Sequence, residues 1–427
     1  MKFLVAYFIA LIISMPAFAE YEDIEFPFWG ETDQNSISFA INASGIYFVD
    51  WGDGTEIEKI EIYDDNPFFN AGHTYTDGVT THRFRIGGRA TRYETNVTDG
   101  NAAAIFFHGC TTITDVNGCS LCKLTAMGGC IGCIFPTIGD GDEPGQQPRF
   151  FRSFAGCRNM TGSIPPDLFK GIHGKPINHM FYWTFASSSF SGTIPEDLFA
   201  DIEGAPTTNM FNNAFTRTKL TGEIPARLFR GIKGAPAKQM FSGTFSVVPG
   251  LNGTISADLF AGIKGAPAED MFRWAFYNTS ITTIEDGLLS GISGPSATNS
   301  FTDMFTGGTP ISCMPNDLFD GITGVNLSAV FSPVPKKCSC PTECGVGYEV
   351  GECGCIEYPK CDAGFTQLKT DTGLSFPLYA RPCTSPALYF GYGDKVCTAC
   401  LGEDAAPNSI NIQIGEDVYH IVDPTAK

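Results

Sequence analysis

The sequence predicts a mixed α/β repeat solenoid over residues 150–331, preceded by a β-sandwich and followed by a small disulfide-rich β module. The central prediction depends on a period of about 30 residues that is held over six units. One phenylalanine opens each unit, at Phe150, Phe181, Phe211, Phe241, Phe272, Phe301 and Phe331. One isoleucine follows a pair of large apolar residues in each unit, at Ile172, Ile202, Ile232, Ile263, Ile292 and Ile322. The flanking predictions depend on strand-like alternation before residue 100 and on nine cysteines after residue 337.

Each unit is expected to form one strand and two short helices. Residues 220–224 alternate between apolar and polar side chains, as a half-buried strand does. Leu228 and Ile232 lie four positions apart, which predicts the apolar face of a first helix. Phe241 and Phe245 have the same spacing and predict a second helix. Because a single unit cannot bury these faces alone, neighbouring units must stack around a shared core.

Two phrases in the repeats carry a resemblance to a known family. They are Leu220-Thr-Gly-Glu-Ile-Pro-Ala-Arg-Leu and Phe154-Ala-Gly-Cys-Arg-Asn-Met-Thr-Gly-Ser-Ile-Pro. Both resemble leucine-rich repeats, and the Phe-x-Gly-Cys element before Ile-Pro is similar to the BspA-like repeats of bacterial surface proteins. The resemblance covers residues 105–331 and implies a leucine-rich-repeat-like solenoid. The unit is longer than the usual repeat of about 20 to 29 residues, and phenylalanine often stands where leucine is common.

Residues 20–100 are expected to form a β-sandwich. Alternating apolar positions lead into Asp50-Trp51-Gly52-Asp53-Gly54-Thr55, where Asp-Gly predicts a tight turn between two strands. With His73-Thr74-Tyr75 after it, this order resembles the PKD-type domain, which implies a spacer or adhesion module. Asp50 and Asp53 could suggest calcium. Because calcium takes about six to eight oxygen ligands and no such set is visible, turn chemistry is the preferred interpretation.

The N-terminus and the charge predict where the protein works. Residues 1–19 have the pattern of a secretory signal peptide: Lys2, an apolar run, and Ala17-Phe18-Ala19 as the cleavage site. No later apolar stretch is long enough for a membrane span. A net charge of −19 disfavours binding to nucleic acid or anionic lipid. The expected product is a secreted or cell-surface protein, and its 16 cysteines indicate an oxidising compartment.

Residues 101–149 are expected to form a degenerate capping repeat that contains two Cys-x2-Cys pairs. These pairs are Cys119 with Cys122 and Cys130 with Cys133. Such pairs can hold zinc in a tetrahedral site, or they can serve thiol-redox chemistry. Because the seven-residue spacer is short for a zinc site and the compartment is oxidising, disulfides are preferred. Metal binding or redox chemistry at these four cysteines remains the alternative.

Residues 332–337 are expected to be a linker, and residues 338–427 a Cys-rich module that ends in a β-hairpin over 410–422. Nine cysteines lie in the module. Because nine is odd, Cys313 is a candidate for the missing partner. The disulfide candidates along the chain are Cys119, Cys122, Cys130, Cys133, Cys313, Cys338, Cys340, Cys344, Cys353, Cys355, Cys361, Cys383, Cys397 and Cys400.

The sequence predicts a binding or adhesion protein that is not an enzyme and has no cofactor. Motifs for a serine nucleophile, a phosphate loop or a dinucleotide are missing from the sequence. Outward strand positions carry small polar side chains, at Thr161, Ser163, Ser191, Thr193, Thr221, Glu223, Asn252 and Thr254. We expect this strand ladder to form a concave surface for an extracellular protein or glycan. The alternative is that these residue types simply suit an exposed strand.

Overall fold

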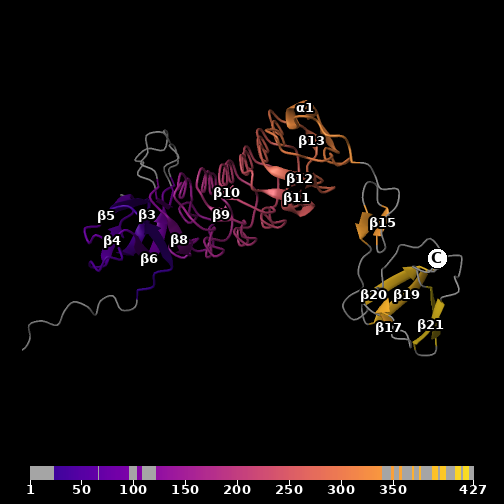
Figure 1. Cartoon of the computed structure of the whole chain (residues 1–427), viewed down its shortest axis with the longest axis horizontal. Coiled ribbons are helices and arrows are strands. Elements are labelled where there is room, and N and C mark those ends of the chain that lie inside the picture. The colour runs from indigo at the N-terminus through magenta and orange to yellow at the C-terminus, as the bar shows by residue number, and fades with distance from the viewer. Residues whose placement is uncertain are drawn as a thin grey trace, which may run out of the picture. The chain divides into compact units, whose positions relative to one another are not determined.

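The computed structural model describes residues 24–95 except 66, residues 103–107 and 122–338, and the backbone of eight strands between 348 and 422. The predicted signal peptide lies outside the described residues. The chain divides into two compact units, residues 1–337 and 338–427. The first unit holds an N-terminal pair of sheets and the repeats (Figure 1).

Two antiparallel sheets form the N-terminal part. The larger has the order β4-β3-β6-β1-β8 and the smaller β5-β2-β7. Their strands are β1 (Phe28–Thr32), β2 (Ser36–Ile41), β3 (Ala43–Asp50), β4 (Glu58–Ile62), β5 (Phe69–Thr74), β6 (His82–Tyr93), β7 (Ile105–Phe106) and β8 (Ala126–Gly129). The last two come from the segment expected to be a capping repeat, so that segment completes both sheets.

Aromatic side chains fill the space between the two sheets and continue into the repeats. The Phe39 ring packs against those of Phe84 and Phe107, with centroids 5.8 and 5.5 Å apart. Phe107 in turn stacks on Phe154 of the first repeat, at 5.4 Å. One buried cluster therefore runs from the sheets into the repeats, which indicates that the two parts share a core within the first unit.

The Asp-Gly segment uses its carboxylates within the turn, as the turn interpretation predicts. Asp50 accepts the Gly52 N–H at 2.9 Å and pairs with Arg85. Asp53 accepts the Thr55 hydroxyl at 2.6 Å and contacts His73 Nε2 at 2.7 Å. Burial alone would raise the pKa of Asp53, but the hydrogen bonds from Thr55 and His73 outweigh it and lower the pKa to about 2.

We expect Asp53 to stabilise the N-terminal sheets above about pH 4 and to lose this effect as the pH falls toward 2. The direction follows because a carboxyl whose pKa is lowered by folding binds its proton more readily in the unfolded chain. Asp53→Asn should cost about 1 kcal/mol at pH 5, a modest value because the turn lies near solvent. Thermal unfolding of both proteins from pH 5 to pH 2 checks this. A stability gap that stays constant with pH would contradict it.

The repeats stack through short parallel pairs rather than through a continuous sheet. β9 (Ser191–Gly192) pairs with β10 (Lys219–Leu220), β11 (Asn252–Ile255) with β12 (Ser280–Ile284), and β13 (Gly294–Pro295) with β14 (Ile322–Thr323). Single parallel bridges connect further units, for example between Gly204 and Ile232. The strand expected over 220–224 is interrupted because Gly222 has a φ of 84°, outside the strand region.

The prediction of a mixed α/β, leucine-rich-repeat-like solenoid is wrong. In the described part of the chain, helical structure is limited to the 3-10 helix η1 (Ala257–Phe260) and one α-helix, α1 (Leu327–Val330). Nearly all of the regular structure is strand. The first expected helix is a run of turns, in which Leu228 and Ile232 each donate a backbone hydrogen bond to the residue three positions earlier.

The second expected helix is also a chain of turns. Asn212 N–H donates to the carbonyl of Asn209, three residues earlier, at 3.3 Å. Its neighbour Phe211 donates instead to the Met240 carbonyl of the next unit, at 2.9 Å. Every fourth residue has a positive φ, as at Asn209 and Asn213. A spacing of four thus places apolar side chains on one face of a turn chain as well as on one face of a helix.

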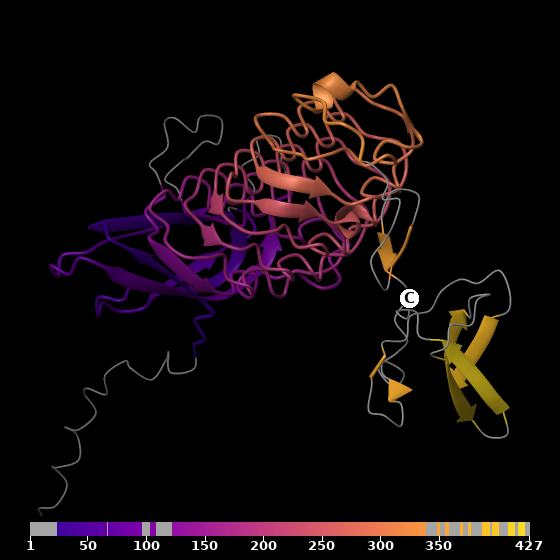
Figure 2. The ribbon, with the colours of Figure 1, turned by 45° about the vertical axis from the view of Figure 1, so that its right-hand side comes forward.

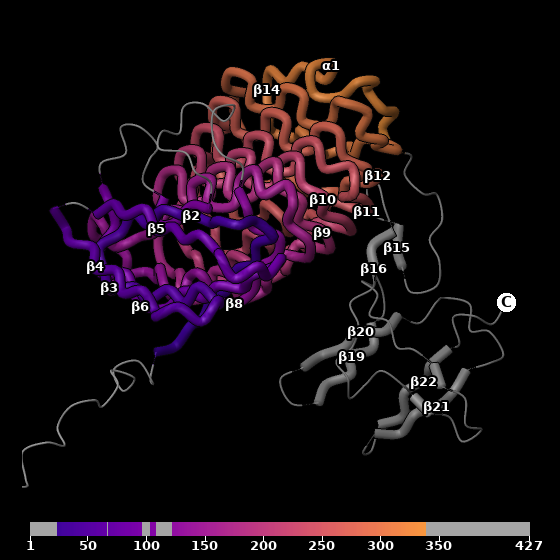
Figure 3. The backbone as a smooth tube through the Cα atoms, turned by 60° about the vertical axis from the view of Figure 1, so that its left-hand side comes forward, coloured from indigo at the N-terminus to yellow at the C-terminus, as the bar shows by residue number. Residues whose placement is uncertain are grey.

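The backbones of consecutive repeats lie side by side in Figure 3. Columns of phenylalanine rings form the core of these repeats. The Phe211 ring stacks between those of Phe181 and Phe241, at centroid distances of 5.6 and 5.8 Å. Two more columns run through Phe215 and Phe229 at the same register. Equivalent residues of consecutive units are therefore neighbours in space.

The second unit is described only by its strand backbones (Figure 2). They are β15 (Tyr348–Val350), β16 (Cys355–Glu357), β17 (Leu368–Lys369), β18 (Ser375–Phe376), β19 (Ala387–Tyr392), β20 (Lys395–Cys400), β21 (Ser409–Ile414) and β22 (Asp417–Val422). They pair in sequence order as four antiparallel two-stranded sheets. The pair β21–β22 occupies the residues of the expected hairpin, and β19–β20 forms a sheet of its own.

Candidate functional site

The strand ladder lies mostly at the surface, but several of its hydroxyls are used within the stack. Six of its eight side chains are exposed, and Ser191 and Thr254 are half-buried. The hydroxyls of Thr161, Ser191 and Thr221 donate to backbone carbonyls of the preceding chain segment, at 2.9 to 3.4 Å. These side chains therefore connect neighbouring units, which leaves fewer free hydrogen-bond donors for a ligand.

The cysteines that the structure describes in the predicted cluster form disulfides. Cys130 is bonded to Cys133, and Cys122 is bonded to Cys157. Cys119 lies outside the described residues. Cys157, which belongs to the Phe-Ala-Gly-Cys phrase, was not among the disulfide candidates. Because a disulfide sulfur is not a thiolate, the three described members hold no zinc in this oxidised form.

The structure describes the disulfides predicted for the Cys-rich module only at its first cysteine and at the candidate partner before it. Cys313 and Cys338 are both disulfide-bonded, and the pairing of the other tail cysteines lies outside the described residues. Across the part of the chain that the structure describes, no three His, Cys, Asp or Glu side chains converge as a metal site would require.

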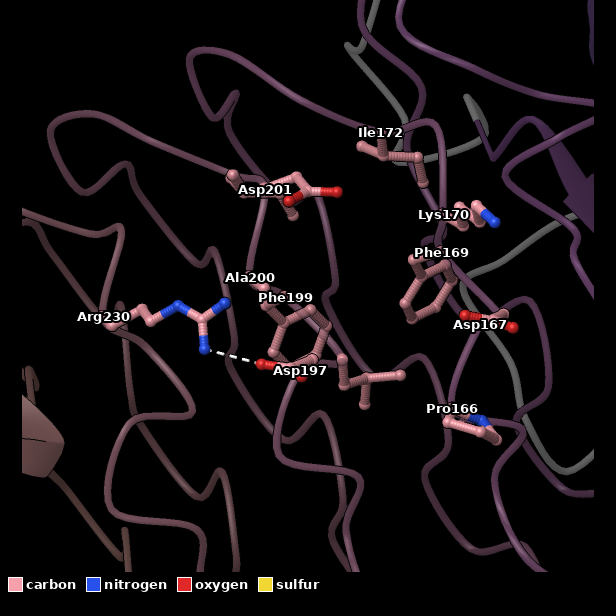
Figure 4. A pocket seen from close by; sticks show the side chains of 12 residues that line it. Pro166, Asp167, Phe169, Lys170, Ile172, Asp197, Phe199, Ala200, Asp201 and Arg230 are labelled. Atoms are coloured by element: carbon pink, nitrogen blue, oxygen red, sulfur yellow. Dashed lines mark hydrogen bonds and ion pairs between the residues drawn. The ribbon is translucent and has the colours of Figure 1, made fainter.

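A cavity of about 260 Å³ opens over the turns that follow the strands (Figure 4). Phe169 and Phe199 are among its apolar lining residues, and charged side chains of both signs surround them. Arg230 donates to the Asp197 carboxylate at 2.6 Å, so these two charges neutralise each other. The lining contains no serine, cysteine or histidine, and its ionisable side chains are carboxylates, Lys170 and Arg230.

A second surface, only partly exposed, lies on the turn chains and was missed by sequence reasoning. We call it the turn face. It is built around the second residue after each repeat phenylalanine: Arg152, Trp183, Asn213, Gly243, Trp274 and Asp303. Each donates its backbone N–H to a carbonyl of the next unit, at 2.6 to 3.0 Å, and each has a φ between 54° and 61°. These shared features show that the six residues occupy equivalent positions in consecutive units.

Aromatic rings and arginines are concentrated at both ends of the turn face. The Arg152 guanidinium lies 5.1 Å from the centroid of the Trp183 ring. At the other end, Arg273 lies 3.9 Å from the centroid of Trp274. Trp274 is 38% exposed, and its Nε1 donates to Asp303 Oδ2 at 3.2 Å. Each tryptophan is thus held in place by a cation.

Between the two tryptophans the turn face is polar. Asn212 Nδ2 donates to Asn209 Oδ1 at 2.8 Å, and Asn209 Nδ2 donates to His179 Nε2 at 3.0 Å. Burial, and then the charge of Arg149, lowers the pKa of His179. Its ring is therefore neutral at pH 7, as an acceptor at Nε2 must be.

No known family, curated protein or solved structure matches the chain. The resemblance to BspA-like repeats and to PKD-type domains therefore stays a prediction. In the described ranges, none of the helices has the length and apolar character that a membrane span needs.

Proposed function

We propose that this is an exported binding or adhesion protein that contacts an extended protein or glycan through its repeats and does not act as an enzyme. One observation carries the proposal. Equivalent residues of consecutive units are aligned in columns, so each surface position of the repeat recurs at regular intervals along the stack. A repeated surface of this kind suits a ligand that is itself long.

Two further observations support export. The buried disulfide between Cys122 and Cys157 needs an oxidising compartment, and the first 19 residues have the sequence pattern of a signal peptide. The mature chain would then begin at Glu20, which N-terminal sequencing of the secreted protein can check. A chain retained in the cytoplasm with Met1 in place would contradict export.

The binding proposal is tested by screening the mature chain against arrays of glycans and of extracellular proteins. A quadruple variant examines the strand ladder: Thr161→Lys, Thr193→Lys, Thr221→Lys and Thr254→Lys. Three of the four positions are exposed and Thr254 is half-buried. We expect the thermal midpoint to change little, because exposed substitutions usually shift stability by less than about 0.5 kcal/mol each. We also expect binding to persist, because the hydroxyls of Thr161 and Thr221 are already engaged within the stack.

Two results would change this view. Loss of binding in the folded quadruple variant would make the ladder the contact surface. Turnover of a substrate by the purified chain, dependent on a metal or a thiol, would contradict the non-enzymatic proposal.

A further inference from the structure

We infer that the turn face binds a neutral carbohydrate chain, with Trp183 and Trp274 as the platforms for its sugar rings. The inference rests on the proposed binding function and names the surface and the class of ligand. It is carried by the backbone at the two tryptophans, by the surface between them, and by buried polar atoms without hydrogen-bond partners.

The backbone at the two tryptophans is unfavourable for their side chains. Trp183 and Trp274 have φ values of 56° and 58°, in the left-handed region that bulky residues rarely adopt. The equivalent positions in the two units between them hold Asn213 and Gly243, which tolerate this conformation best. The same conformation recurs at every fourth residue of the turn chains, so it is the choice of tryptophan at these two positions, rather than the backbone itself, that costs stability which asparagine would not.

A polar segment separates the two tryptophans. Three unit-to-unit steps of about 4.8 Å separate them, or about 14 Å in all. Gly243 lies in this interval and is buried, and the Asn213 side chain covers it, since a Cβ at Gly243 would come within 2.5 Å of Asn213 Oδ1. A chain of several sugar rings that extends from one tryptophan to the other would therefore meet the half-buried amide of Asn213 rather than a bulky side chain.

Polar atoms of the turn face are left without hydrogen-bond partners. Trp183 Nε1 is buried and donates to nothing, and buried Asp270 Oδ1 accepts no hydrogen bond. Asp270 is 6% exposed, pairs with Arg273 through Oδ1 at 3.5 Å, and accepts a hydrogen bond from Gln239 Nε2 at Oδ2, at 3.4 Å. Buried polar groups are normally satisfied, so the unpaired indole N–H of Trp183 is a candidate donor for a hydroxyl group of a ligand.

The composition of the face favours a carbohydrate over a protein. Trp274 is the single strongly exposed large hydrophobic side chain between residues 150 and 331, whereas the centre of a stable protein interface is a larger apolar patch. Sugar rings combine an apolar face, which stacks on tryptophan, with a rim of hydroxyls, which suits amides and carboxylates. A neutral sugar is favoured because the chain carries a net charge of −19 and would repel a polyanion.

The test uses the full mature chain and four neutral hexasaccharides, built from β-1,4-linked glucose, β-1,4-linked N-acetylglucosamine, α-1,4-linked glucose and β-1,4-linked mannose. Titration calorimetry and tryptophan fluorescence measure binding. We expect at least one hexasaccharide to bind, and Trp183→Asn or Trp274→Asn to weaken it about tenfold each. Because asparagine suits a positive φ, both variants should keep or raise the thermal midpoint. A structural role for the rings would lower it.

Matched variants separate the possible outcomes. Trp29→Ala, in β1, and the quadruple lysine variant of the ladder should bind normally, and Trp274→Phe should retain part of the affinity. A hexasaccharide that binds both asparagine variants as tightly as the native chain would overturn the assignment to the turn face. If no hexasaccharide binds at millimolar concentration but an arrayed protein does, the carbohydrate inference is wrong and the binding function stands. If nothing binds in either screen, both fail.

Discussion

Replacing Phe211 with alanine is expected to lower the free energy of unfolding by about 3 to 5 kcal/mol, the usual range for a buried aromatic residue. The Phe211 side chain is fully buried. Its ring stacks on Phe181 and Phe241 of the adjacent units and packs against Phe199 and Phe229, whose centroids are 4.9 and 4.5 Å away. Truncation therefore opens a cavity that three units share. Urea denaturation followed by circular dichroism measures the loss.

The damage should spread beyond its own unit, because stacked repeats depend on their neighbours for stability. Hydrogen exchange should show lowered protection on both sides of residue 211. Thr221→Ala is the matched control in the same unit. Thr221 is exposed and its hydroxyl makes one long hydrogen bond of 3.4 Å, so it should cost well under 1 kcal/mol. Equal losses for the two substitutions would mean that the buried and exposed faces are assigned wrongly.

The repeat period could be predicted from the sequence because stacking brings equivalent residues together. A column of rings such as Phe181, Phe211 and Phe241 requires the same residue in each unit, and the period records that requirement. The helices were predicted wrongly because a spacing of four fits both an α-helix and a chain of turns. Asn209 and Asn213, which favour a positive φ, were the signal that could have distinguished the two structures.

The candidate site was harder to predict because it depends on that local backbone. On a helix, the residue two positions after each phenylalanine would point away from the apolar face, with no defined relation between units. In the turn chain, the same position donates to the next unit, which aligns Trp183 and Trp274 on one surface. The sequence holds a clue in retrospect: both tryptophans stand at the same offset from a repeat phenylalanine.

The long-range disulfide was missed for a related reason. Cysteine spacing along the chain drew attention to Cys122 and Cys119, whereas the bond joins Cys122 to Cys157, 35 positions away. A pairing across the junction between the sheets and the first repeat depends on how β8 pairs with β1. That pairing could not be predicted while the segment was taken for a capping repeat.

Removing this disulfide, by the double substitution Cys122→Ala and Cys157→Ala, is expected to cost about 4 kcal/mol. The value follows from the chain entropy that a closed loop of this length removes from the unfolded state. Both sulfurs are buried, and the bond ties the segment that enters β8 to the first repeat. Loss should therefore loosen the junction before the distal repeats. Thermal unfolding without reductant measures the total cost, and hydrogen exchange locates it.

The bond between Cys130 and Cys133 provides the control in the same segment. Its partners are three positions apart, so the loop that it closes is short and the same entropy argument gives only about 2 kcal/mol. Cys130→Ala with Cys133→Ala should therefore be the milder change, with protection preserved at residues 150–331. If the short-range pair proves the more costly to remove, loop entropy does not govern this junction. Local packing of Gly132 against the Lys170 carbonyl would then make the dominant contribution to the stability of the junction.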